Sequence, residues 1–183
     1  MKKNQPIMKA KYEAILPELK KALGVENVLA LPRIEKVTVN VGIGKFLKEQ
    51  ARVDEIVASL VSITGQKPVL TKARKAIAGF KIREGLEVGA KVTLRGRRMW
   101  QFLDRVIYAT IPRTRDFQGI PKTAIGRDGN CNIGLREHLI FPEIVPEKVQ
   151  TPFGLQVVIT TSAGDEKAGR ELFRLLGFPI RTE

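Results

Sequence analysis

The chain has 183 residues, one cysteine and 43% hydrophobic side chains, a composition that suits one folded domain and excludes a disulfide scaffold and wholesale disorder. Lysine and arginine total 32 against 19 acidic residues, so the net charge is +13, which favours a polyanionic partner such as nucleic acid. No apolar run is long enough to cross a bilayer, and residues 1–6 are not followed by the apolar region of a secretory signal.

The excess positive charge is concentrated in one segment. Residues 66–98 carry ten basic and two acidic side chains, whereas residues 24–65 carry five of each. A smaller basic excess lies in residues 1–23. Solubility alone does not require such clustering, so residues 66–98 are the first candidate for contact with a polyanion. A basic surface that meets only solvent is the alternative.

The N-terminal part predicts a helix and then a strand. Apolar residues recur at helical spacing over 8–23, and Gly24 follows at a position where helices commonly end. Pro17 lies inside this segment, so either a kink or a later start is expected. Residues 34–41 alternate between apolar and polar, which predicts a strand. Its polar face consists of Lys36, Thr38 and Asn40.

The middle of the chain predicts a second helix over 53–63, ended by Gly65, and a short strand over 68–71. Residues 72–90 contain three glycines and many charges, so they form either a long mobile loop or a loop with a short hairpin arm. Because apolar anchoring is sparse there, we expect high mobility over 72–83 in the free protein.

A further strand is predicted over 91–95, and its outward face carries Lys91, Thr93 and Arg95. A third helix is predicted over 97–109, and the segment 112–132 is rich in proline, glycine and aspartate, so it is expected to be mostly loop.

The C-terminal part predicts strand pieces within 133–141, a strand over 155–161 and a last helix over about 165–176. Ser162 with Asp165 resembles a capping box at the start of that helix.

The predicted architecture is α+β: an antiparallel sheet with helices packed on one face and an open polar face on the other. Neither an internal repeat nor an interdomain linker is apparent, so residues 1–183 are expected to form one domain. The open face would combine the polar sides of 34–41 and 91–95 with Gln156 and Thr160. The wide, shallow minor groove of RNA presents 2′-hydroxyls and phosphates that suit such a face. An ordinary solvated sheet face is the alternative.

Specific chemistry of other kinds is not indicated. Aromatic residues mostly follow apolar stripes, and no strand carries a stacking pair, so structured RNA is favoured over unpaired RNA. Cys131 and His138 lack further ligands of their kind, which argues against a zinc site. The Gly-Ile-Gly-Lys run at 42–45 is followed by Phe46, where a phosphate loop needs a hydroxyl. Without an acid–base set, we expect a non-enzymatic protein with no metal and no cofactor.

Several motifs point to a known family. The principal runs are 62–68, 71–75, 79–83, Gly89, 91–96 and Met99-Trp100. Further matches are Pro32-Arg33, Asn40, Pro112-Arg113, Arg115-Asp116-Phe117, Gly119 and 141–144. In combination these motifs closely resemble the bacterial large-subunit ribosomal protein L5 family, the 5S-rRNA-binding proteins of the central protuberance. The resemblance covers nearly the whole chain.

The resemblance implies a five-stranded antiparallel sheet and a structural role in the large ribosomal subunit. The protein would bind 5S rRNA beside large-subunit rRNA and neighbouring central-protuberance proteins, and would be cytoplasmic and ribosome-bound, with no membrane partner. A basic flexible loop at about 71–90 would contact P-site tRNA. A surface within 109–150 would bridge to a small-subunit head protein, with Glu137, Glu143 and Glu147 as candidates to meet a basic tail.

The family's contact positions carry over to particular residues. Its contacts to 5S rRNA match Asn40, Gln66 and Thr93. With their neighbours, the expected rRNA-binding set is Lys36, Thr38, Asn40, Gln66, Lys67, Lys91, Thr93 and Arg95. The expected tRNA-binding set is Lys72, Arg74 and Lys75.

Other functions stay open from the sequence. A general nucleic-acid binder or RNA chaperone would discriminate poorly between 5S rRNA and an unrelated duplex. An RNA-processing enzyme would show metal-dependent turnover. Residues 72–83 would form a rigid arm buried in rRNA if they do not contact tRNA.

Overall fold

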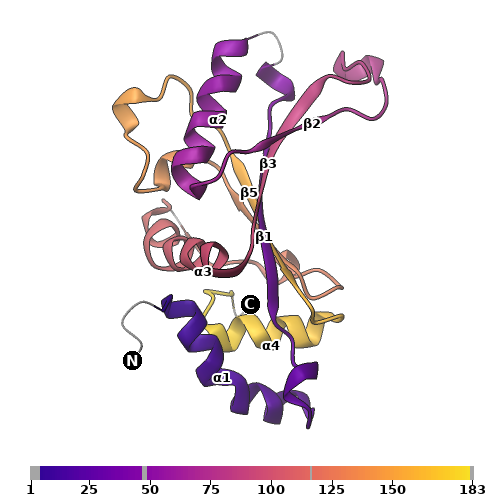
Figure 1. The fold of residues 1–183 in the computed structure, drawn as a ribbon, viewed down its shortest axis with the longest axis vertical. Coiled ribbons are helices and arrows are strands. Elements are labelled where there is room, and N and C mark those ends of the chain that lie inside the picture. The colour runs from indigo at the N-terminus through magenta and orange to yellow at the C-terminus, as the bar shows by residue number, and fades with distance from the viewer. Residues whose placement is uncertain (1–4, 47–48, 116, 182–183) are drawn as a thin grey trace. The chain divides into compact units, whose positions relative to one another are not determined.

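The computed structural model describes residues 5–46, 49–115 and 117–181. Asp116, which contributes to the family resemblance, and residues 1–4 lie outside the described residues. The helices of the described chain are α1 (Ile7–Leu23), α2 (Gln50–Thr64), α3 (Gly96–Arg105) and α4 (Glu166–Leu176). The strands are β1 (Ile34–Gly42), β2 (Val69–Lys72), β3 (Glu87–Leu94), β4 (Cys131–Leu135) and β5 (Leu155–Thr161) (Figure 1). Among these residues, none of the helices combines the length and apolar character that crossing a bilayer requires.

The five strands form one antiparallel sheet in the order β2-β3-β1-β5-β4, which confirms the predicted α+β class. Along β1, Val37, Val39 and Val41 are at most 1% exposed, and the polar residues between them are half-exposed. Side chains of a strand point alternately to its two faces, so this pattern requires one covered face and one open face. The alternation predicted for 34–41 is therefore confirmed.

The chain folds into two compact units, each built from segments that are separated in sequence. The first unit contains residues 1–37, 94–133 and 158–183, and the second contains residues 38–93 and 134–157. Because neither unit is one continuous stretch, composition and linker patterns gave no sign of the division.

In the first unit, α1 packs against both α3 and α4. Helix α1 starts at Ile7, and Pro17 lies inside it without shortening it. The inward side chains of this helix are Met8, Ile15 and Leu19. The apolar stripe predicted within 97–109 is buried as well. Hydrophobic burial of these helix faces is the main stabilising contribution in this unit.

A carboxylate from a distant part of the sequence caps α1. The residue before the helix is Pro6, whose side chain has no acceptor for the first free N–H groups. Asp104 of α3 supplies both acceptors: Oδ2 accepts from Ile7 N at 2.9 Å, and Oδ1 accepts from Met8 N at 2.7 Å. A negative charge at this end also complements the helix dipole. Asp104 therefore joins α1 to α3 by charge-assisted hydrogen bonds.

The capping box predicted from Ser162 is wrong. Helix α4 begins at Glu166, and Asp165 is itself the N-cap, with Oδ1 accepting from Ala168 N at 2.7 Å. Ser162 Oγ instead accepts from Arg33 N at 3.1 Å. Aspartate is a preferred N-cap residue, and here it lies where the first helical N–H groups need an acceptor.

Two boundaries in the middle of the chain differ from prediction. Helix α3 ends at Arg105, and a π-helix over Val106–Thr110 replaces the predicted α-helical turn. Pro112 follows, and since it lacks an N–H, the chain cannot continue the α-helical hydrogen bonds there. Strand β3 begins at Glu87, earlier than predicted, and ends at Leu94.

In the second unit, α2 ends at Gly65, which has φ +68° and donates its N–H to Val61 O at 2.8 Å. The buried face of α2 includes Val53, Ile56, Leu60 and Ile63. A long non-helical segment is fastened to this helix, because Glu55 Oε1 accepts from Gln150 N at 3.0 Å. The helix therefore serves both as the cover of the unit's core and as an anchor for that segment.

Candidate nucleic-acid interface

The outward face of the sheet in the second unit carries polar side chains. Strand β1 contributes Thr38 and Asn40, and β3 contributes Lys91 and Thr93. Lys91 is exposed and the other three are half-exposed, whereas Val92 between the two β3 residues is buried. These four side chains therefore lie on the open face, as the alternation predicted.

A glycine leaves a gap in this face. Thr71 of β2 pairs with Gly89 of β3 in the antiparallel register. A methyl group added to Gly89 would lie 2.7 Å from Thr71 Oγ1 and 4.0 Å from Asn40 Oδ1. A hydroxyl and an amide from the strands on either side of β3 therefore converge over bare backbone. The sequence analysis did not include Thr71 in the face, because the pairing of β2 with β3 cannot be read from either strand alone.

Gln66 is positioned at the end of β3 by the turn that leaves α2. Its Nε2 donates to Thr93 O at 3.4 Å, and its backbone N donates to Thr64 Oγ1 at 3.3 Å. Gly65 adopts the left-handed conformation that lets the chain reverse at this point. The structure therefore brings Gln66 and Thr93 together, as the expected site requires, and the adjacent Lys67 is exposed.

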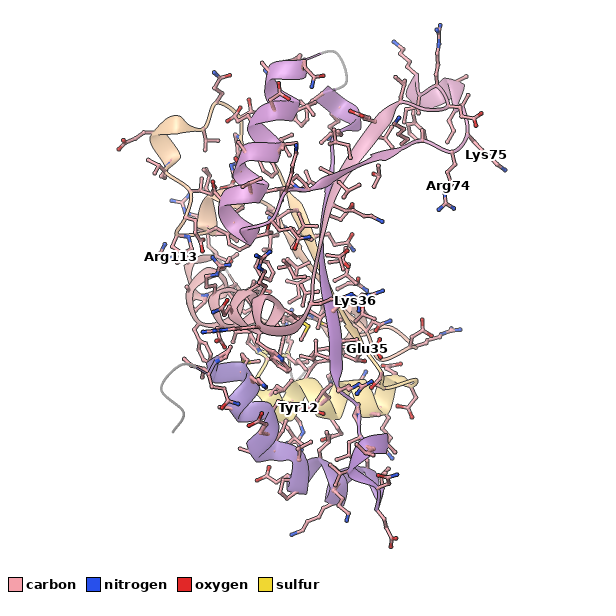
Figure 2. The ribbon with its side chains drawn as sticks, in the orientation of Figure 1. Tyr12, Glu35, Lys36, Arg74, Lys75 and Arg113 are labelled. Atoms are coloured by element: carbon pink, nitrogen blue, oxygen red, sulfur yellow. The ribbon has the colours of Figure 1, made fainter. Side chains whose placement is uncertain are left out.

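Two of the predicted rRNA-binding residues belong to the first unit. Lys36 lies on β1 and is half-exposed (Figure 2). Arg95 was expected on the strand, but β3 ends at Leu94, and Arg95 is the exposed N-cap residue of α3. The glycine that follows, Gly96, has φ +57° and turns the chain from strand to helix, which is why the strand pattern stops there.

The segment between β2 and β3 is a hairpin arm, one of the two forms expected for 72–90. At its base, Ala73 N donates to Leu86 O at 2.8 Å. Near its tip, Ile77 and Ile82 exchange backbone hydrogen bonds of 2.9 and 3.2 Å. The expected tRNA-binding residues Lys72, Arg74 and Lys75 are all exposed, and Figure 2 shows Arg74 and Lys75 pointing outward from the arm.

The positive charge of the basic segment is directed to solvent. All ten basic side chains of residues 66–98 belong to exposed residues. They are Lys67, Lys72, Arg74, Lys75, Lys81, Arg83, Lys91, Arg95, Arg97 and Arg98. Exposed cations in this number raise the local concentration of a polyanion and contribute to its affinity in a salt-dependent way.

Cys131 and His138, which the sequence analysis singled out, lie in the cores of different units. Burial raises the pKa of the Cys131 thiol to about 12, so the reactive thiolate is scarce at neutral pH. His138 Nδ1 accepts from Phe153 N at 3.3 Å, and the two rings stack with centroids 3.8 Å apart. Burial lowers the pKa of His138, against smaller opposing effects of that hydrogen bond and of Glu55 and Glu137. Both residues therefore act in packing.

The acidic residues considered for a bridge are presented unequally. Glu137 and Glu147 are exposed, whereas Glu143 is half-buried. Only the first two offer fully accessible carboxylates to a basic partner. Within the described residues, no cluster of three or more potential metal ligands occurs.

Comparison with known proteins identifies the family. Residues 27–83 match the family described as Ribosomal protein L5, and residues 87–180 match the description of that ribosomal family's C-terminus. The chain is 50% identical over 169 residues to the large ribosomal subunit protein uL5 of Halothermothrix orenii, covering 92% of this chain and 94% of that protein. It is 47% identical over 175 residues to the uL5 protein of Rubrobacter xylanophilus, covering 95% and 97% respectively. The chain therefore belongs to the ribosomal protein L5 family.

Proposed function

We propose that this chain, a structural and non-enzymatic constituent of the large ribosomal subunit, binds 5S rRNA through the outward sheet face of its second unit. It anchors that RNA in the central protuberance and resides in the cytoplasm, bound to the ribosome. The observation that carries the proposal is the convergence of Asn40 and Thr71 over Gly89, on the same face as Thr93 and Lys91.

The chemistry of this face suits the edge of an RNA helix. Amide and hydroxyl groups both donate and accept hydrogen bonds, as 2′-hydroxyls and base edges do. The gap at Gly89 lets a sugar approach the backbone, because no side chain stands between Thr71 and Asn40. Lysines such as Lys67 and Lys91 neutralise phosphates and strengthen binding without reading sequence. Recognition therefore divides into shape readout by the polar groups and affinity from the cations.

Binding of the purified protein to 5S rRNA tests the proposal, with an unrelated RNA duplex of equal length as the control. A marked preference for 5S rRNA at physiological salt is expected. Equal affinity for the two RNAs would contradict the proposal and would support a general nucleic-acid binder, because electrostatic attraction alone does not discriminate between them. Lys67→Gln is expected to weaken both complexes and to lower the salt dependence by about one counterion.

The arm is proposed to contact P-site tRNA. Its exposed cations Lys72, Arg74 and Lys75 are carried on a hairpin whose backbone hydrogen bonds hold it away from the sheet. Replacing all three residues by glutamine in assembled ribosomes is expected to weaken P-site tRNA binding while 5S rRNA stays in the subunit. Loss of 5S rRNA with unchanged tRNA binding would instead assign the arm to rRNA.

The acidic surface is proposed to bridge to a basic protein in the head of the small subunit. Charge reversal by Glu137→Lys together with Glu147→Lys is expected to weaken subunit association more at low salt than at high salt. Glu26→Lys, an exposed acidic position in the first unit, is a matched control that should leave association unchanged. Equal effects of the two charge changes would contradict a specific bridge.

A further inference from the structure

A groove of about 710 Å³ lies within the second unit, beside the base of the arm. Its walls include three phenylalanine rings, Phe46, Phe80 and Phe153. Three glycines, Gly42, Gly44 and Gly154, contribute bare backbone, and Lys45 and Ile82 also line it. The volume is in the range of small-molecule sites, and the mixture of π faces, backbone polar groups and one cation is typical of sites that hold a flat heteroaromatic group.

The three rings are not equally available to a ligand. Phe153 is buried and stacks on His138, so one of its faces is occupied. Phe46 has the Arg52 guanidinium 5.6 Å from its ring centroid. Phe80 is 73% exposed, a large apolar area for a side chain that a monomer has no packing reason to present. Phe80 is therefore the ring with a face free for stacking.

The arm fixes the position of Phe80. Ile77 and Ile82 form a backbone bridge that closes the turn containing Phe80. Lys81, next to it, has φ 55°, a conformation that a lysine adopts only where the surrounding structure imposes it. A turn held in this way presents Phe80 in a defined place beside the groove, which reduces the entropy lost when a ligand binds.

Charge decides between the possible occupants. Among the described residues that line the groove there is one lysine and no carboxylate. The exposed cations Lys75, Lys81 and Arg83 lie on the same arm. A polyanion that carries flat bases is attracted by both features, whereas an apolar peptide gains nothing from the cations.

We propose that this groove holds an unstacked RNA base, which stacks on Phe80 while its phosphate lies near Lys45. The inference rests on the proposed RNA-binding function and adds to it a second kind of contact: the sheet face binds helical RNA, and the groove takes one base out of the stack. Stacking of a base on an aromatic ring tolerates different sequences, so the groove selects RNA in which an unpaired base projects, without strong preference for its identity.

The test uses the full-length protein and a short single-stranded oligoribonucleotide that contains one 2-aminopurine base. Stacking on Phe80 is expected to quench the fluorescence of that base on binding. Phe80→Leu keeps an apolar side chain but removes the π face, and should weaken binding roughly 5- to 150-fold and abolish the quenching. Ile77→Val, on the same arm but outside the groove, is the matched control and should change neither. An oligonucleotide abasic at the probe position should bind as weakly as Phe80→Leu binds the intact one.

Two results would overturn the inference: unchanged binding by Phe80→Leu, or equal binding of the abasic and intact oligonucleotides. Amide NMR signals of Gly42, Gly44 and Gly154 report occupancy directly. Adenosine monophosphate should shift them, and shifts caused only by an uncharged phenylalanine-containing peptide would mean that the groove binds protein instead. Binding of 5S rRNA is measured separately through Asn40 and Thr93, so failure of the groove leaves the sheet-face proposal standing, and the reverse also holds.

Discussion

Gly89 provides a stringent check on the geometry of the proposed interface. In Gly89→Ala, the new methyl group would lie 2.7 Å from Thr71 Oγ1 and 3.4 Å from Val41 O. The first contact is too short for carbon and oxygen, so the Thr71 side chain must move. Since Thr71 Oγ1 and Asn40 Oδ1 flank the same gap, the substitution should also reduce affinity for 5S rRNA.

The effect on stability follows from opposing contributions. Moving Thr71 away from its preferred rotamer costs about 0.5–1.5 kcal/mol. Replacing glycine by alanine at an unstrained position stabilises by about 0.4–1 kcal/mol through the unfolded chain. Gly89→Ala alone should therefore lie between neutral and about 1 kcal/mol destabilising. In a Thr71→Ala background the close contact is absent, so the same change should stabilise. The expected coupling between the two positions is about 0.5–1.5 kcal/mol.

Urea unfolding of the wild type, both single variants and the double variant measures this coupling from the midpoints, provided that the m-values agree. Gly134→Ala is the matched control, because Gly134 lies on β4 with no atom within 4 Å of its added methyl group. It should be neutral or stabilising. A coupling below about 0.3 kcal/mol, which is the usual additivity error, would refute the assigned register of β2 and β3.

Three further outcomes are expected. Asp104→Ala removes both acceptors at the start of α1 and should lower the free energy of unfolding by about 1–2 kcal/mol, whereas Asp54→Ala, on exposed α2 surface, should change it by less than about 0.5 kcal/mol in urea unfolding. Burial lowers the pKa of His138 below 6.5, so the folded state binds fewer protons than the unfolded state just below that pH. Stability should be complete above about pH 6.5 and fall as the pH drops below it, and His138→Gln should show less of this fall in pH-dependent unfolding. In tRNA titrations, Arg74→Gln should lower the salt slope by about one, and an unchanged slope would exclude a phosphate contact by that side chain.

The features that the sequence predicted depend on local pattern. Alternation along 34–41 placed Thr38 and Asn40 on one face, because the period of a strand is fixed by its backbone. The clustered charge of residues 66–98 indicated an exposed basic surface, since unpaired cations are rarely buried. Both kinds of inference need only neighbouring residues, and the structure agrees with both.

The features that the sequence did not predict depend on pairs of residues brought together by folding. Thr71 was not recognised as part of the polar face, because its neighbour across the sheet is set by strand register. Asp104 caps a helix that begins almost a hundred positions earlier, at Ile7. Phe80 was treated as an ordinary part of a basic loop, and only the closure of the turn shows that its ring is exposed beside a groove. Sequence spacing contains none of this information.

The most direct test of shape readout by the sheet face is the affinity of Asn40→Ala with Thr93→Ala for 5S rRNA, measured across a salt series. The double variant should lose most of the preference for 5S rRNA over duplex, at about 1–3 kcal/mol for each truncation. Its salt slope should stay that of the wild type, because the cations are unchanged. Retained preference for 5S rRNA, or a slope that falls along with the affinity, would show that the basic segment rather than the polar face recognises the RNA.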